Sequence, residues 1–258
     1  MSKWINLLLV LAFSFTYLPS QAQSVDEIVN KYIDAMGGKE KLNSIKSLYM
    51  EGVAVGQNGN EINTSVWKAD KKLLRSEISF GMGSITMIIT DKEGWSSNPR
   101  SGGKFEPIPA DRVQNAQQEL DCAGPLVDYA AKGHKAELIG KEDVEGKPAY
   151  RIKLSLANAQ ELTYFIDAQS YYIIRELRKG GGFGGGGGRP GGGGQGAAGG
   201  QQPQGPTELT IDYTDYKKTP DGYTFAYTVT RKGMGGAMTY EKIEVNKPID
   251  EKLYKPSK

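Results

Sequence analysis

Alternation of apolar and polar residues dominates the chain and predicts a protein built mainly of β-strands. Tyr150, Ile152 and Leu154 fall on one side of a strand. Arg151 and Lys153 alternate with them on the other side. Because side chains alternate across a strand, one face of the predicted sheet is apolar and the other is solvated. This pattern, or an apolar run between turn residues, predicts about eleven strands, at 47–56, 61–69, 72–80, 84–91, 135–142, 147–156, 161–167, 171–178, 207–216, 222–230 and 238–245.

Helical spacing replaces this alternation in two places. Residues 25–36 repeat apolar positions with helical spacing, and Ser24 with Glu27 forms a capping box at the start. The segment 110–129 predicts a helical insert of two short helices divided by Gly124-Pro125. Short connections between successive strands favour an antiparallel sheet, with these helices packed on it.

One strand differs from the others because it is apolar on both faces. The run from Ile85 to Ile89 requires cover on both sides, and the helices supply it for one face. A curved sheet around two short helices has more inner surface than they can fill, which predicts a hydrophobic cleft. For each residue, ordinary core packing is the alternative interpretation. The side chains that we expect to line the cleft are Trp67, Ile78, Phe80, Ile85, Met87, Ile89 and Trp95, with Tyr150 and Phe225 on opposing strands.

Two segments stand apart from this domain. Residues 1–22 have a positive start, an apolar run and small residues before Ala22, which predicts a cleaved secretory signal peptide. With no Cys near this cleavage site, we expect no N-terminal lipid anchor. Residues 180–206 contain 16 of the 34 glycines, which predicts a flexible loop with too little to bury. We therefore expect a single domain over 23–258, interrupted by this loop.

Composition excludes several functions. A net charge of +2 provides no basic excess for binding nucleic acid. One His and one Cys exclude an internal disulfide and a zinc site of the usual type. His134 lies in a polar turn, where we expect it to be exposed, and Cys122 in the helical insert reads as a small buried hydrophobe. These observations predict a protein that is not an enzyme and needs no cofactor or metal.

The second half of the chain carries a recognisable pattern: Leu138-x-Gly140-Lys141-Glu142-x-Val144-x-Gly146-x-x-x-Tyr150-x-Ile152-x-Leu154, followed by Tyr164-x-Ile166-Asp167. This pattern resembles the central hairpin of outer-membrane lipoprotein-sorting proteins, the relatives of the carriers LolA and LolB. The segments at 32–38, 215–225 and 243–246 resemble the same family. The long glycine-rich insertion departs from the family pattern.

The resemblance implies a mainly β, α+β fold: a half-open antiparallel β-barrel of about eleven strands, with a helical lid on its concave face. It implies a monomeric periplasmic carrier whose partners are a lipid or lipoprotein acyl chain and, beyond that, envelope membrane proteins. A different class of function stays open, an envelope scaffold or interaction protein that uses the glycine-rich loop. A hydrolase that uses carboxylates is a further alternative.

Overall fold

The computed structural model describes residues 23–56, 59–81, 83–179, 208–233 and 236–257. The predicted signal peptide, 1–22, and the predicted glycine-rich loop, 180–206, lie outside the described residues.

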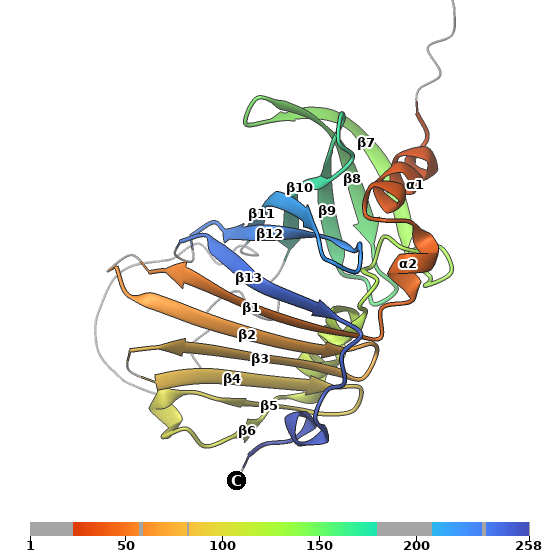
Figure 1. The fold of residues 1–258 in the computed structure, drawn as a ribbon. Coiled ribbons are helices and arrows are strands. Elements are labelled where there is room, and N and C mark those ends of the chain that lie inside the picture. The colour runs from red at the N-terminus through yellow and green to blue at the C-terminus, as the bar shows by residue number, and fades with distance from the viewer. Residues whose placement is uncertain (1–22, 57–58, 82, 180–207, 234–235, 258) are drawn as a thin grey trace, which may run out of the picture.

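The described strands form one antiparallel sheet of thirteen members (Figure 1). All eleven predicted strands are present. Two short additions, β5 and β6, lie outside the predicted strands, because strands this short show no clear alternation. The strands are β1 (Ser47–Val55), β2 (Glu61–Ala69), β3 (Leu73–Phe80), β4 (Gly83–Thr90), β5 (Gly94–Ser97), β6 (Glu106–Pro107), β7 (Lys135–Val144), β8 (Lys147–Ser155), β9 (Glu161–Asp167), β10 (Ile173–Lys179), β11 (Glu208–Lys218), β12 (Thr224–Arg231) and β13 (Met238–Val245).

The sheet is open, as predicted for a half-barrel. Its strand order is β6-β5-β4-β3-β2-β1-β13-β12-β11-β10-β9-β8-β7, so β6 and β7 are the two edges. Figure 1 shows β7–β9 standing steeply against β1–β6, so the sheet is strongly twisted and bent. Among the described residues the pairing between β12 and β13 is short, with Thr228 opposite Thr239 and Val229 opposite Met238.

Two helical segments, residues 25–43 and the insert, pack on one side of this sheet. Helix α1 (Val25–Ala35) begins with the predicted capping box: the Glu27 amide donates to Ser24 Oγ at 3.2 Å, and the Ser24 amide donates to Glu27 Oε2 at 3.2 Å. Helix α2 (Lys39–Asn43) follows it. The insert contains α3 (Ala110–Asn115) and the 3₁₀-helix η2 (Gln117–Leu120). The break between them falls at Ala116 rather than at Gly124-Pro125, and the chain beyond Leu120 continues as turns.

We call the face that packs on these helices the inner face. Under α1 it contributes Ile152 and Ile166 to a core cluster, and under α3 and η2 it contributes Ile89. The outer face of β3–β5 packs instead against a C-terminal 3₁₀-helix, η3 (Glu251–Tyr254). Ile88 and Ile89 are both fully buried, one on each face. The predicted need for cover on both sides of β4 is thus met, with η3 as the second cover.

Candidate functional site

Seven of the nine predicted cleft residues share the inner face. Residues that lie opposite one another in an antiparallel pair point to the same side of the sheet. Ile78 lies opposite Ile85, and the alternation along β4 continues through Met87 to Ile89, which contacts the insert. On β3 the same alternation places Phe80 with Ile78. Tyr150 and Phe225 belong to the inner cluster under α1.

The two tryptophans lie on the outer face. Trp67 is opposite Arg75, and Trp95 is opposite Ile88. Trp67 packs beside Tyr49, with ring centroids 5.3 Å apart, and Trp95 packs in the cluster under η3. The sequence pattern shows which residues of one strand share a side, but not which side faces inward, because a shift of one residue exchanges the two.

Exposure increases along the inner face away from the insert. The cluster beneath α3 and η2 includes Leu74, Met87 and Ile89, but not Ile78 or Phe80, which are half-buried. Ile85, at the far end of β4, is 39% exposed. The 3₁₀-helix η1 (Pro99–Ser101) lies against Gly83 at this end of β4, and Ile85 stays exposed beside it. The inner face therefore combines a closed region under the insert with an accessible apolar region beyond it.

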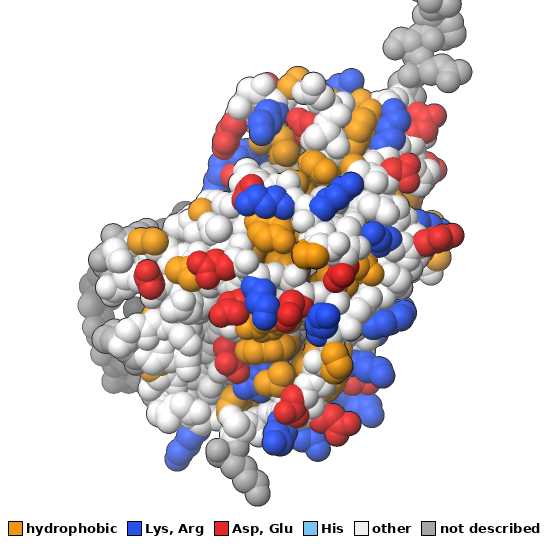
Figure 2. Space-filling view, in the orientation of Figure 1, with side chains coloured by type: hydrophobic (Ala, Val, Ile, Leu, Met, Phe, Trp, Pro, Cys, Tyr) orange, Lys and Arg blue, Asp and Glu red, His pale blue; other side chains and the backbone are white. Residues whose placement is uncertain are grey.

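Charge separates the two faces of the first four strands. On the described strands β1–β4, the inner positions carry one charged side chain, Lys68, whose Nζ donates to the Asp121 carbonyl at 3.2 Å. The outer positions carry four, Glu51, Glu61, Arg75 and Glu77. Figure 2 shows this outer side, with charges of both signs among apolar side chains. The inner face suits an apolar ligand far better than the outer face does.

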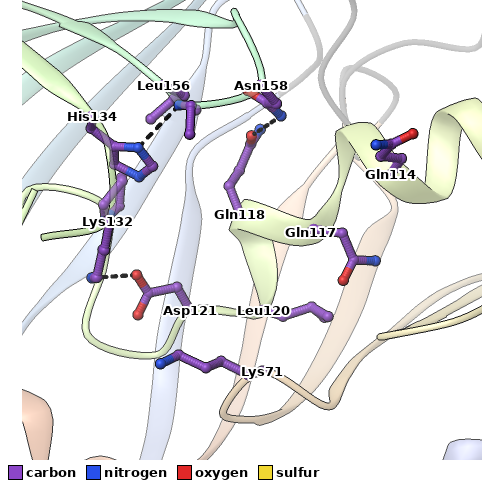
Figure 3. Close-up of a pocket in the computed structure, with 12 residues that line it drawn as sticks. Lys71, Gln114, Gln117, Gln118, Leu120, Asp121, Lys132, His134, Leu156 and Asn158 are labelled. Carbon is purple, nitrogen blue, oxygen red and sulfur yellow. Dashed lines mark hydrogen bonds and ion pairs between the residues drawn. The ribbon is translucent and has the colours of Figure 1, made fainter.

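A cavity of about 470 Å³ opens between the insert and the turn that joins β8 to β9 (Figure 3). Its apolar wall includes Leu120, from the cluster under the insert, and Leu156, from the cluster under α1. It therefore lies where the two inner clusters adjoin. None of the nine predicted cleft residues lines it. The lining residues are Lys71, Gln114, Gln117, Gln118, Leu120, Asp121, Pro125, Lys132, His134, Leu156, Ala157 and Asn158.

His134 is half-buried in this cavity rather than exposed in a turn, as the sequence suggested. The backbone amide of Ala157 donates to His134 Nδ1 at 3.1 Å, which holds the ring against the β8–β9 turn. Burial, with a smaller effect from Lys132, lowers the pKa of His134 below 6.5. The imidazole is therefore neutral at pH 7. Since Nδ1 accepts a hydrogen bond, the ring proton must lie on Nε2.

The other polar groups of the cavity come from segments far apart in the sequence. Lys132 Nζ lies 2.5 Å from Asp121 Oδ2, so this pair is neutralised. Gln118 Oε1 accepts from Asn158 Nδ2 at 3.1 Å, which ties the insert to the β8–β9 turn. Lys71 is exposed at the rim. Sequence reasoning missed these residues because no local motif joins them; the lone histidine was the one available signal.

A buried polar network also connects the insert to the sheet. Glu176 on β10 is 3% exposed, accepts from Arg178 Nε at 2.5 Å, and accepts from the Tyr213 hydroxyl at 2.7 Å. Arg178 also pairs with Glu119 of η2. Burial, together with the nearby Glu176 carboxylate, raises the pKa of Tyr213 well above its usual value. The network holds η2 against β10 through charged groups that are largely shielded from water.

Among the described residues, no group of three or more His, Cys, Asp or Glu side chains could hold a metal ion. No helix in the part of the chain that the structure describes is long and apolar enough to cross a membrane. Cys122 is buried, as predicted, and burial raises the pKa of its thiol to about 11.

Comparison with known proteins places the fold. No family model matches the sequence, and no curated protein matches it significantly. A solved LolA superfamily protein from Nitrosomonas europaea aligns over 91% of this chain and 99% of its own, with a TM-score of 0.51 at 9% identity. This chain has a LolA-like fold. A DUF1329 family protein from Desulfovibrio piger aligns over 91% of this chain and 98% of its own, with a TM-score of 0.52 at 11% identity.

The LolA-like fold agrees with the resemblance seen in the sequence: an open antiparallel sheet that holds helices on its inner face. The described part of the chain forms thirteen strands rather than about eleven. At such low identity the likeness concerns the fold alone. What the inner face does has to be argued from its own residues.

Proposed function

We propose that this protein is a periplasmic carrier of a hydrophobic ligand, a lipid or the acyl chain of a lipoprotein, and that it binds this ligand without chemistry. The ligand occupies the inner face of the sheet, beyond the insert. The residues that we assign to it are Ile78, Phe80, Ile85, Met87 and Ile89, with Tyr150 and Phe225 on the opposing strands.

The observation that carries this proposal is the asymmetry between the two faces of β1–β4. The inner positions are uncharged apart from Lys68 at the insert end, Thr64 and Ser76 are their other polar side chains, and exposure increases toward Ile85. An acyl chain in water costs about 0.8 kcal/mol for each exposed CH₂ group, and an apolar surface of this kind removes that cost. Met87 adds a flexible thioether, which adapts to chains of different shape. The LolA-like fold supports the same function.

Bound lipid provides the first test. The protein is purified from the periplasm without detergent, examined by native mass spectrometry, and extracted for lipid analysis. We expect a lipid in stoichiometric amount, and uptake of a fluorescent fatty acid once that lipid is removed. A protein that is purified empty and takes up no fatty acid would contradict the proposal.

A matched pair of variants tests whether the ligand binds the inner face. Ile85→Glu places a charge on the accessible inner surface, and we expect it to weaken uptake of the fatty acid roughly tenfold, because the chain then lies against a charged side chain. Val55→Glu is the control: Val55 is 57% exposed and lies on the outer face. Equal affinities in the two variants would show that the ligand does not use the inner face.

A further inference from the structure

The cavity beside the insert has a chemistry that the apolar inner face does not explain. His134 Nδ1 is occupied by the Ala157 amide, so the ring presents Nε2–H as a donor, and no described group is seen to accept from it. Figure 3 shows the ring beside the open space between the insert and the β8–β9 turn. A neutral histidine in this tautomer can donate to an acceptor but cannot accept from a donor at that atom.

The charges of the cavity also favour a ligand that carries hydrogen-bond acceptors. Lys132 and Asp121 neutralise each other at 2.5 Å, and Lys132 Nζ also donates to the Gly124 carbonyl at 2.9 Å. Lys71 remains as a further positive charge at the rim, held in place by its backbone amide, which donates to the Leu120 carbonyl at 2.9 Å. The formal charge of the described lining is therefore positive. A positive rim with an N–H donor in the wall favours an anionic group that is rich in acceptors.

The apolar part of the cavity continues into the inner face. Leu120 lines the cavity and also packs in the cluster of Ile89 and Val113. From Ile89 the inner positions of β4 continue through Met87 to Ile85, a distance of about 13 Å at the rise of an extended strand. Ile89, Val113 and Leu120 are buried against one another, so a ligand with its polar end in the cavity reaches the apolar side chains of β4 when the insert moves away from the sheet.

We infer that the cavity binds the anionic end, a carboxylate or a phosphate, of an amphipathic ligand whose apolar chain lies along the inner face. Lys71 attracts the anion, and His134 Nε2–H donates to one of its oxygens. This inference rests on the proposed function, because it assigns the headgroup of the same ligand.

The test compares a fluorescent polyene fatty acid with its methyl ester, which has the same chain without the charge. We expect the acid to bind at least fivefold more tightly than the ester. In Lys71→Gln and in His134→Asn this preference should fall toward one. His134→Asn retains a side-chain oxygen that can accept from the Ala157 amide, so it removes the Nε2–H donor with little disturbance of the turn. Lys72→Gln, an exposed neighbour outside the cavity, is the matched control and should keep the preference of the wild type.

The outcomes separate the two proposals. If acid and ester bind equally well to the wild type, the headgroup inference is wrong, while the carrier function stands. If neither binds, the carrier function itself fails. Competition by dodecanoate and by dodecyl phosphate, compared with dodecanol, identifies the preferred anion, and equal displacement by all three would overturn the inference. Acetate and inorganic phosphate serve as competitors without a chain. If they displace the probe as strongly as dodecanoate and dodecyl phosphate do, the cavity is a site for free anions and the headgroup inference is wrong.

Discussion

Cys122 and His134 show how burial sets the chemistry of single side chains in this protein. Both lie in or beside the insert, and both are shielded by segments distant in the sequence. The Cys122 amide donates to Asp70 Oδ1 at 3.1 Å, while the Ala157 amide holds His134. Burial raises the pKa of the thiol and lowers the pKa of the imidazole, so both groups stay neutral at pH 7.

The thiol provides a pH-dependent prediction. With a pKa of about 11, about one Cys122 side chain in a thousand is a thiolate at pH 8, and the thiolate is the form that reacts. We expect alkylation by iodoacetamide to be very slow in the native protein, to accelerate about tenfold per pH unit between pH 8 and 10, and to become fast in denaturant. Complete alkylation of the native protein within minutes at pH 8 would show that the insert does not shield this residue.

At the scale of elements, alternation predicted the strands well because most of them have one buried face. It failed where the residues that cover a strand or complete a site come from distant parts of the chain. Trp67 and Trp95 alternate with polar residues as an inward-facing side would, but both lie on the outer face, where η3 from the far end of the chain packs against Trp95. The cavity draws on the insert, Lys71, His134 and the β8–β9 turn, a combination that only the folded sheet assembles.

The network that joins η2 to β10 provides a prediction about stability. Arg178→Met leaves Glu176, 3% exposed, without its cationic partner, and removing one member of a buried ion pair typically costs about 3–5 kcal/mol. We expect a corresponding loss in the free energy of unfolding, measured by urea denaturation. Lys153→Met is the control, because its partner Glu161 lies on the surface and such pairs contribute little. A similar effect from both substitutions would argue that the network is not important for stability.

At the scale of the whole molecule, a single sheet carries both the accessible apolar region and the cavity. The two strands on either side of residues 180–207 are neighbours in that sheet, and Lys179 is paired with Glu208. β10 and β11 are therefore paired as the two strands of a β-hairpin are.

This pairing predicts that the segment is dispensable for the fold and for lipid binding. Replacing 180–207 by Asn-Gly places a two-residue turn between a pair that is already in register. We expect the same melting temperature within a few degrees and unchanged uptake of the fluorescent fatty acid. Loss of uptake in a folded variant would assign the ligand site to the segment, and loss of a captured protein partner alone would support the scaffold alternative.

The place of β13 in the sheet has a consequence for how the chain folds. Strands β1–β6 and β7–β12 are each laid down in sequence order, so each group pairs locally. They are joined through β13, which lies between β1 and β12 and is the last strand to be made. Because pairing between distant segments is slow, we expect refolding to be limited by the arrival of β13. A chain that ends before Met238 would leave β1 and β12 as two open edges, each able to pair with another molecule and begin aggregation.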